Sequence, residues 1–156
     1  MIAILRSERS DAPEILRLQK LAYLTEAELY NDFTIPPLVQ TVDELAAEYA
    51  TRVVLKAVNA DGTIVGSVRA YEEDGSCHIG RLMVHPDCRN RGIGRMLMDR
   101  IEGEFPSCSR FELFTGSRST RNLAFYQKLG YRIFRYERLS DAVEFAYLEK
   151  SRPLTP

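Results

Sequence analysis

The chain has 156 residues, of which 45% are hydrophobic and 28% are charged, with 21 Lys and Arg against 22 Asp and Glu. This length suits one domain with one main core, and the formal net charge of −1 offers no broad basic surface for nucleic acid. Its apolar runs are far shorter than the about 20 residues that a membrane-spanning helix needs.

The N-terminal residues lack the pattern of a secretory signal, so we expect a cytoplasmic protein. Cys77, Cys88 and Cys108 are odd in number and lack CxxC spacing. This argues against a disulfide framework and, with only two histidines in the chain, against a metal site. Neither a metal, nor nucleic acid, nor a membrane is therefore expected among the partners.

The N-terminal third is typical of a strand followed by two helices. Residues 2–5 are mostly apolar and predict the strand. Apolar side chains at helical spacing predict a helix over residues 12–29, which ends within residues 31–37 because consecutive prolines cannot continue it. Residues 41–44 resemble a capping box before a short helix that reaches about Tyr49.

The middle of the chain changes to the spacing of strands. Residues 52–58 and 63–71 flank an Asn-Ala-Asp-Gly turn and predict a hairpin, and residues 77–84 predict a further strand. Ile93, Leu97, Ile101 and Phe105 then recur every four residues, which predicts a helix over residues 92–104.

The last third predicts a strand over 111–115, a helix over 120–129 closed by Gly130, and a hairpin of 131–138 with 143–149. The strands 77–84 and 111–115 are joined through a helix, the connection that parallel neighbours require. We expect a single α+β domain over residues 1–156, with a core of about 2–150. Its sheet is mixed and mostly antiparallel, with about seven strands flanked by about four helices.

Residues 85–92 form a loop between a predicted strand and a predicted helix. Their composition favours the binding of an anion. The first N–H groups of a helix lack partners within the helix and lie at the positive end of its dipole. Gly92 and Gly94 permit close approach to the backbone, while Arg89 and Arg91 add cationic donors. The same glycines also suit a tight turn, and the arginines a solvated surface.

Two segments resemble motifs of the GNAT N-acetyltransferase superfamily. Residues 78–86, 89–94 and the helix with Leu97 resemble its central acetyl-CoA motif, [RQ]xxGx[GA] after a strand that ends in Val and Pro. Residues 122–131, NLAFYQKLGY, resemble its Asn-x3-Tyr-x-Lys-x-Gly-Phe/Tyr segment. The order of predicted elements matches the superfamily from about residue 2 to residue 150.

The resemblance implies a direct transfer of an acetyl group from acetyl-CoA to a primary amine of a small molecule, amino acid or peptide, in a ternary complex. It also implies that one strand end pairs with the pantetheine arm and that residues 89–94 hold the pyrophosphate. The residues expected at the cofactor are Leu82, Met83, Val84, Arg89, Asn90, Arg91, Gly92, Ile93, Gly94, Arg95, Asn122 and Tyr126.

The resemblance places Tyr126 beside the thioester sulfur, where its phenol can protonate the departing thiolate. His78 is the candidate base, because strand alternation predicts that residues 78, 80 and 82 share one face of the cleft. Glu28, Asp32 and Glu112 are competing bases, and loss of the amine proton to solvent is a further route. Cys88 has no readable His and carboxylate partners and is not expected to be a nucleophile.

Glu28, Tyr30 and Asp32 lie in the region where the resemblance implies acceptor binding. The two carboxylates suit a cationic amine, and they suit equally the capping of a helix end. A non-catalytic acyl-CoA sensor or scaffold is the alternative function. A nucleotide-binding module is a weaker one, since the loop lacks a GK[ST] ending and a third dinucleotide glycine. Both a monomer and a homodimer, paired through residues 131–145, fit the sequence.

Overall fold

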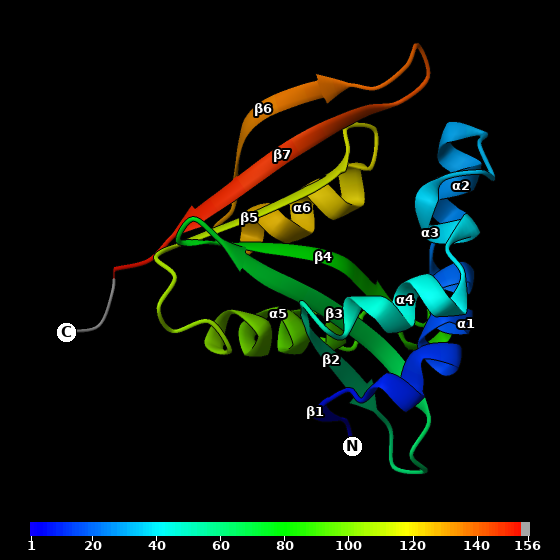
Figure 1. Ribbon diagram of the computed structural model, residues 1–156. Helices are drawn as coiled ribbons and strands as arrows, with labels where there is room; N and C mark the ends of the chain where they lie inside the picture. The colour runs from blue at the N-terminus through cyan, green and yellow to red at the C-terminus, as the bar shows by residue number, and fades with distance from the viewer. Residues whose placement is uncertain (154–156) are drawn as a thin grey trace.

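The strands form one continuous sheet. The computed structural model describes residues 1–153, and the predicted domain end at residue 156 lies outside the described residues. The strand order is β1-β2-β3-β4-β5-β7-β6 (Figure 1), and every neighbouring pair is antiparallel except β4 with β5. The bounds are β1 (Ala3–Arg6), β2 (Val53–Val58), β3 (Ile64–Glu73), β4 (Ser76–Val84), β5 (Arg110–Gly116), β6 (Arg132–Arg138) and β7 (Glu144–Ser151). The predicted mixed, mostly antiparallel sheet is confirmed.

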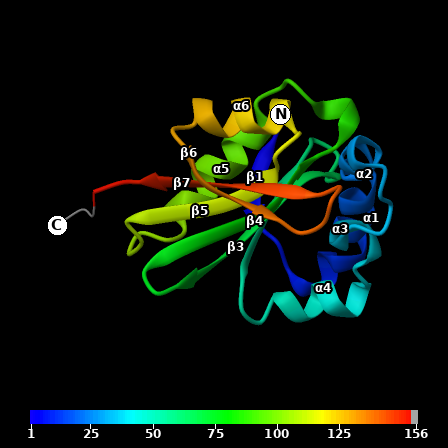
Figure 2. The same cartoon turned by 90° about the horizontal axis from the view of Figure 1, so that it is seen from above.

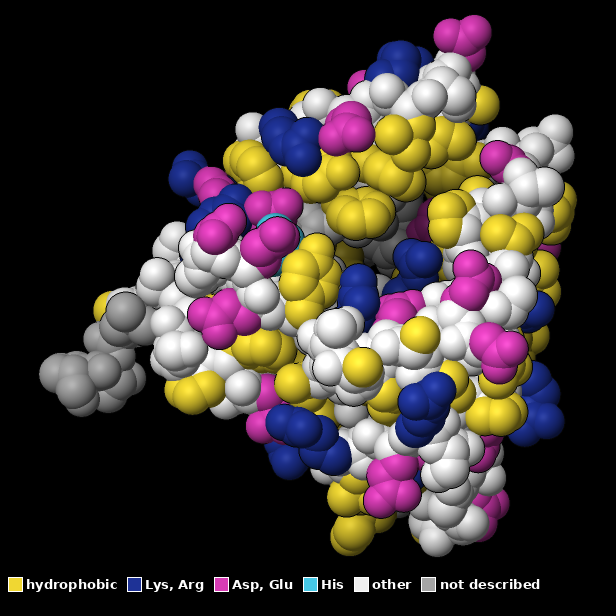
Figure 3. Space-filling model, in the orientation of Figure 1, with side chains coloured by type: hydrophobic (Ala, Val, Ile, Leu, Met, Phe, Trp, Pro, Cys, Tyr) yellow, Lys and Arg dark blue, Asp and Glu magenta, His cyan; other side chains and the backbone are white. Residues whose placement is uncertain are grey.

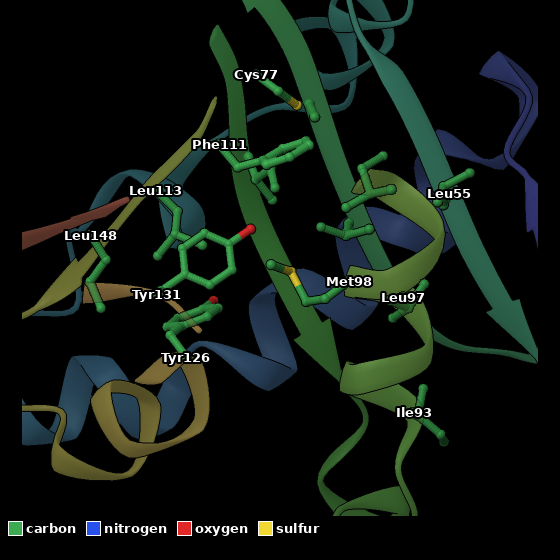
Figure 4. Close-up of a cluster of buried hydrophobic side chains, with 14 of the residues drawn as sticks. Leu55, Cys77, Ile93, Leu97, Met98, Phe111, Leu113, Tyr126, Tyr131 and Leu148 are labelled. Carbon is green, nitrogen blue, oxygen red and sulfur yellow. The ribbon is translucent and has the colours of Figure 1, made fainter. Parts of the chain in front are cut away.

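Helices cover both sides of this sheet (Figure 2). On one side lie α5 (Ile93–Gly103) and α6 (Thr120–Lys128), and on the other lie α1 (Ala12–Ala22), α3 (Pro36–Val39) and α4 (Val42–Glu48). Each layer buries its own apolar cluster against the strands. The cluster on the side of α5 and α6 includes Val68 and Ile101 together with Leu55, Leu97 and Phe111, and the last three are labelled in Figure 4. The cluster on the side of α1 and α4 includes Ile15, Leu18, Leu45, Val54 and Met83.

The predicted helix over residues 12–29 is broken in two. α1 ends at Ala22, and α2 (Leu24–Tyr30) follows after Tyr23, whose φ of −87° and ψ of 1° leave the helical region. α1 buries Ile15 against the sheet, whereas α2 buries Ala27 and Tyr30. A single straight helix cannot bury both sets of side chains. The spacing of the apolar residues alone did not predict the change of direction between α1 and α2.

The helix count is also higher than predicted. α3 begins at Pro36 and Pro37, where the sequence indicated only the end of the preceding helix. Proline is well suited to the first helical positions, because the N–H that it lacks has no partner there. With α1 and α2 separate, residues 1–153 contain six α-helices together with the short turns η1 (Arg9–Asp11) and η2 (Pro86–Cys88).

A β-bulge interrupts β4. Ser67 of β3 is opposite Met83 and Arg69 is opposite Gly80, so one β3 residue between them faces two β4 residues, Arg81 and Leu82. Arg81 has a φ of +52°, a left-handed conformation that is uncommon for a residue with a side chain. The bulge therefore reverses which side of the sheet the following residues of β4 face.

The prediction that residues 78, 80 and 82 share one face is wrong for this reason. Ile79 packs in the α5 cluster before the bulge, and Leu82 packs against the same cluster after it. Met83 instead packs in the α1 cluster. His78 stacks on Tyr71, so it lies on the sheet face opposite to Ile79 and Leu82.

Candidate active site

The central feature of the candidate site is a split between β4 and β5. The two strands pair only from Ser76 with Arg110 to His78 with Glu112, and then diverge. The edge of β4 from Gly80 to Val84 that faces β5 therefore has no strand partner there. The β-bulge at Arg81 and Leu82 lies in this unpaired part of β4. Figure 3 shows a hollow between the strand layer and the α1–α4 layer, with Lys and Arg side chains inside it.

The loop before α5 has the geometry of an anion site. Gly92 precedes the helix with a φ of +81°, a conformation that favours glycine, and a Cβ there would meet nothing within 4 Å. The first N–H groups of α5 are free, since the helical ladder begins with the Met96 N–H on the Gly92 carbonyl, 3.0 Å away. Gly94 has a different reason: a Cβ at Gly94 would lie 3.2 Å from the Phe125 ring, so its absence permits α5 to pack on α6.

Arg89 in the loop before α5 and Arg121 on α6 lie close enough for their charges to interact. Burial lowers the pKa of Arg89, and the positive charge of Arg121 on α6 lowers it further. Arg89 Nη2 also donates to Thr25 Oγ1 at 3.4 Å. Neither arginine has an ion-pair partner among residues 1–153, so both are available to a phosphate group. Arg121 was missed in the sequence because only the fold brings α6 beside the loop.

The other residues predicted around the pyrophosphate divide by exposure. Asn90, Arg91 and Arg95 are exposed near the start of α5, and Asn90 has a φ of +64°. The Ile93 side chain is buried in the core, which leaves only its backbone for a ligand. Leu82 and Val84 are half-buried on the α5 side of β4, and Met83 is buried on the other.

Asn122 is held at the mouth of the split by a carboxylate that the sequence did not single out. Asn122 Nδ2 donates to Glu26 Oε1 at 2.7 Å and to Thr115 Oγ1 at 3.3 Å. Ser119 Oγ donates to the same Glu26 oxygen at 2.9 Å. Glu26 thus ties α2 to the β5–α6 loop. Its position one helical turn before Tyr30, on the same side of α2, was the available signal.

Tyr126 is buried between two aromatic rings. Its side chain is 9% exposed, with the Phe125 ring 5.2 Å away and the Tyr131 ring 6.0 Å away, both edge-on (Figure 4). Burial raises the pKa of Tyr126 far above the usual phenol value, and the nearby charges of Tyr23 and Glu26 act in the same direction. No hydrogen-bond partner of its hydroxyl lies within residues 1–153. The hydroxyl proton is therefore not engaged by another residue in this part of the chain.

His78 lies where β4 and β5 part. Its ring stacks on Tyr71 with centroids 5.0 Å apart, and its Nδ1 is 3.9 Å from Glu112 Oε2. Glu112 in turn accepts a hydrogen bond from Arg110 at 2.9 Å. Two of the predicted base candidates, His78 and Glu112, are therefore neighbours at the closed end of the split.

The three residues predicted to bind the acceptor lie in different surroundings. Glu28 lines a pocket of about 400 Å³ between α2 and the β5–α6 loop, together with Thr25, Glu26, Leu29, Arg118, Ser119, Thr120 and Arg121. Tyr30 is buried, and its hydroxyl accepts from the Arg118 N–H at 3.0 Å. Asp32 accepts from the Thr34 hydroxyl at 2.6 Å and from the Thr34 N–H at 2.9 Å. These bonds lower the pKa of Asp32 and hold its carboxylate within its own turn.

The sequence also did not reveal a buried cation, Arg69, on the α1 side of the sheet. The Arg69 side chain is 2% exposed and bonds Glu48 at 2.8 Å. Gln19 and Gln40 accept from the remaining Arg69 nitrogens, each at 3.1 Å. These four residues come from α1, the α3–α4 connection, α4 and β3. Because they are far apart in the sequence, no local pattern predicts that they meet.

Residues 1–153 contain no group of three or more His, Cys, Asp or Glu side chains placed to hold a metal ion. Cys77, Cys88 and Cys108 are free thiols, and burial raises the pKa of Cys77 to about 12. In the same part of the chain, every helix is too short or too polar to cross a membrane.

Several solved structures that share this fold are described as acetyltransferases. The PaiA N-acetyltransferase of Thermoplasma acidophilum, in complex with coenzyme A, has a TM-score of 0.82 at 18% identity and covers 97% of this chain and 99% of its own. The ribosomal-protein-S18-alanine N-acetyltransferase of Escherichia coli has a TM-score of 0.81 at 15% identity, covering 100% and 97%. The protein yncA of Salmonella typhimurium, with its cofactor acetyl-CoA, has a TM-score of 0.76 at 15% identity and covers 100% of this chain and 98% of its own. This chain therefore shares the fold of these structures.

The family model for the acetyltransferase (GNAT) family matches residues 14–131, and the chain belongs to this family. The predicted GNAT membership and acyltransferase class are thereby confirmed. Among curated proteins of Bacillus subtilis, YqkA is 28% identical over 124 residues and YdhI is 34% identical over 103. These alignments cover 80% and 64% of this chain, which spans only 35% of YqkA and 58% of YdhI.

Proposed function

We propose that the protein transfers an acetyl group from acetyl-CoA to a primary amine by direct attack in a ternary complex. The split between β4 and β5 carries this proposal, because it opens beside the free N-terminus of α5 and the unpaired Arg89 and Arg121. Membership of the acetyltransferase (GNAT) family supports acetyl as the group that is transferred. The coenzyme A bound to the PaiA enzyme supports acetyl-CoA as the donor.

The residues around the split fit such a donor. The unpartnered edge of β4 at Leu82, Met83 and Val84 suits the amides of a pantetheine arm. The N–H groups after Gly92, with the guanidinium groups of Arg89 and Arg121, suit a pyrophosphate. Asn90, Arg91 and Arg95 add polar groups at the rim, and Asn122 is held at the mouth of the split.

Acetyl-CoA supplies the acetyl group as a thioester. During transfer a nitrogen–carbon bond forms and the carbon–sulfur bond breaks, while the amine loses one proton and the thiolate gains one. Tyr126 is the proposed source of the second proton, because its phenol is protonated at neutral pH and none of residues 1–153 accepts a hydrogen bond from it. Unpaired N–H groups of β4 are the proposed donors to the charge that develops on the carbonyl oxygen.

His78 is the proposed acceptor of the amine proton. It lies where the paired part of β4 and β5 ends, and its Nε2 is the nitrogen proposed to reach the amine directly or through a bridging water. Glu112 Oε2 lies 3.9 Å from His78 Nδ1, too far for a hydrogen bond. Glu28 lines the pocket beside α2 and is proposed as an acceptor contact with Tyr30, whereas the carboxylate of Asp32 is engaged by Thr34.

The proposal is tested by ligand-dependent stabilisation followed by turnover. Acetyl-CoA at 100 times its Kd should stabilise the protein by about 2.7 kcal/mol, and ATP and NAD should not. A panel of primary amines should then give acetyl-CoA-dependent thiol release and acetylated products by mass spectrometry. Stabilisation by ATP or NAD alone would refute the donor. Tight acetyl-CoA binding without turnover across the panel would indicate a sensor instead.

A further inference from the structure

The split contains an arginine that the proposed acetyl-CoA contacts do not use. Arg81 is the bulge residue of β4, at the point where this strand has left β5. A bulge re-aims the side chain that it carries, and bulges are common beside active sites. Arg81 therefore occupies the β4 wall of the split, one residue before the segment proposed to hold the pantetheine arm.

The Arg81 guanidinium has no counter-ion. Among residues 1–153 it forms no ion pair, and its buried Nε has no hydrogen-bond partner. Buried polar groups are nearly always paired, and a charged one without a partner is costly. Arg69 on the neighbouring strand shows the usual solution, with Glu48 and two glutamines around its guanidinium.

The groups that surround Arg81 do not neutralise it. Its positive charge lowers the pKa of Arg69, where burial is the larger cause, so the two cations repel each other. It also opposes the rise that burial gives to the pKa of Tyr23. Glu48 is engaged by Arg69 at 2.8 Å and by Arg52 at 3.4 Å. Glu26 is occupied by Asn122 and Ser119.

An aromatic surface lies on the other wall of the split, formed by β5 and its neighbouring strands. Phe114 follows Glu112 on the same face of β5 and is 47% exposed. Its ring packs on Phe145 and Tyr147 at 4.8 and 5.2 Å, and Phe134 approaches Tyr147 at 6.4 Å. Apolar side chains are gathered above the hollow in Figure 3. A ligand between the walls thus meets a cation on β4 and aromatic rings on β5.

We propose that the acceptor is a primary amine that also carries a carboxylate, namely an α-amino acid with an aromatic or aliphatic side chain. Arg81 binds the carboxylate and the rings around Phe114 contact the side chain. A guanidinium presents two parallel N–H groups that match a carboxylate, which also supplies the missing negative charge. This inference rests on the proposed acetyl transfer and narrows its acceptor.

The test compares acceptors that differ only in the carboxylate. L-Phenylalanine should be acetylated with a kcat/KM at least about 30-fold above that of phenethylamine. Arg81→Gln should remove this preference by raising the KM for L-phenylalanine, with the KM for acetyl-CoA unchanged. Arg17→Gln, which removes an exposed cation from α1, is the matched control and should keep the preference. A wild-type preference for phenethylamine, or a preference retained in Arg81→Gln, would overturn the proposal.

Two further measurements distinguish loss of the Arg81 site from an effect on folding and from a failure of the proposed acetyl transfer. Arg81→Gln should melt no lower than the wild type, because it removes an uncompensated charge; a lower melting temperature would indicate a structural arginine. With CoA present, N-acetyl-L-phenylalanine should stabilise the wild type but not Arg81→Gln. Binding of this product without any turnover would refute acetyl transfer and keep the Arg81 site, whereas absence of binding would refute the site.

Discussion

At the scale of single residues, Tyr126 and Arg81 differ in burial: Tyr126 is 9% exposed, whereas Arg81 is half-buried. Burial raises the pKa of the Tyr126 phenol, and the residue packs in the core. Arg81 forms no ion pair among residues 1–153, and its buried Nε has no hydrogen-bond partner there. A bound carboxylate would supply the negative charge that Arg81 lacks.

Replacement of Tyr126 by Phe should lower kcat by about 10²-fold or more, since general acid catalysis typically contributes that factor. The aromatic packing with Phe125 and Tyr131 is retained, so the melting temperature and the KM for acetyl-CoA should change little. Tyr136→Phe is the control, because Tyr136 is 57% exposed on β6. Steady-state kinetics that show equal kcat in Tyr126→Phe and the wild type would exclude Tyr126 as the acid.

Glu48→Gln should lower the free energy of unfolding by about 3 kcal/mol at pH 7, because Arg69 is left buried without its counter-ion. Glu73→Gln, an exposed change on β3, should have almost no effect. Urea unfolding of both variants measures the difference.

The same pair predicts a pH dependence. Burial tends to raise the pKa of Glu48, but the charge and hydrogen bonds of Arg69 outweigh it and lower the pKa below 4.5. A lowered pKa in the folded state gives stability that is complete above the unfolded value of about 4.5 and is lost as the pH falls through the folded value. The gap between wild type and Glu48→Gln should therefore narrow below pH 4.5. A gap that widens there would contradict the assignment.

At the scale of elements, the contact between α2 and the end of β5 is the tightest at the site. A Cβ at Gly116 would lie 2.1 Å from the Tyr30 hydroxyl oxygen and 2.6 Å from its ring. Tyr30 in turn accepts the Arg118 N–H, and Glu26 on the same helix accepts from Asn122. Gly116 thus permits α2 to close against the β5–α6 loop.

Gly116→Ala should destabilise the protein by about 1–3 kcal/mol, because the new methyl group forces Tyr30 out of its place. The KM for the acceptor should rise as well, since α2 moves with Tyr30. Gly103→Ala is the control, as a Cβ at this helix end meets nothing within 4 Å. In a double-mutant cycle the cost should shrink in a Tyr30→Ala background. An equal cost in both backgrounds would show that Tyr30 is not the cause.

Elements with a local signature were predicted from the sequence. The loop 85–92 and the helix after it were correct because Gly92 and the apolar residues Ile93, Leu97 and Ile101 act through near neighbours. The break at Tyr23 and the bulge at Arg81 were not predictable, because each depends on what packs against it from far along the chain. The same holds for Glu26 and Arg121, which reach the site only through the docking of α2 and α6.

At the scale of the whole molecule, the sheet has two antiparallel parts. β1 to β4 form one, with β3 and β4 covered by α1, and β5, β7 and β6 form the other, with the aromatic rings around Phe114 on its surface. Only the three register pairs from Ser76–Arg110 to His78–Glu112 join them. The proposed donor and acceptor both lie where these parts diverge.

The short parallel pairing also has a mechanical consequence. The three register pairs fix the separation of β4 and β5 at one end, and beyond His78 and Glu112 no pairing between these two strands fixes it. A pantetheine arm bound to β4 between the two parts, as proposed, would act as a spacer and would set the distance from Arg81 on one part to Phe114 on the other. The width that selects the acceptor would then be defined only after the donor is in place, so the order in which the two substrates bind would follow from the sheet itself.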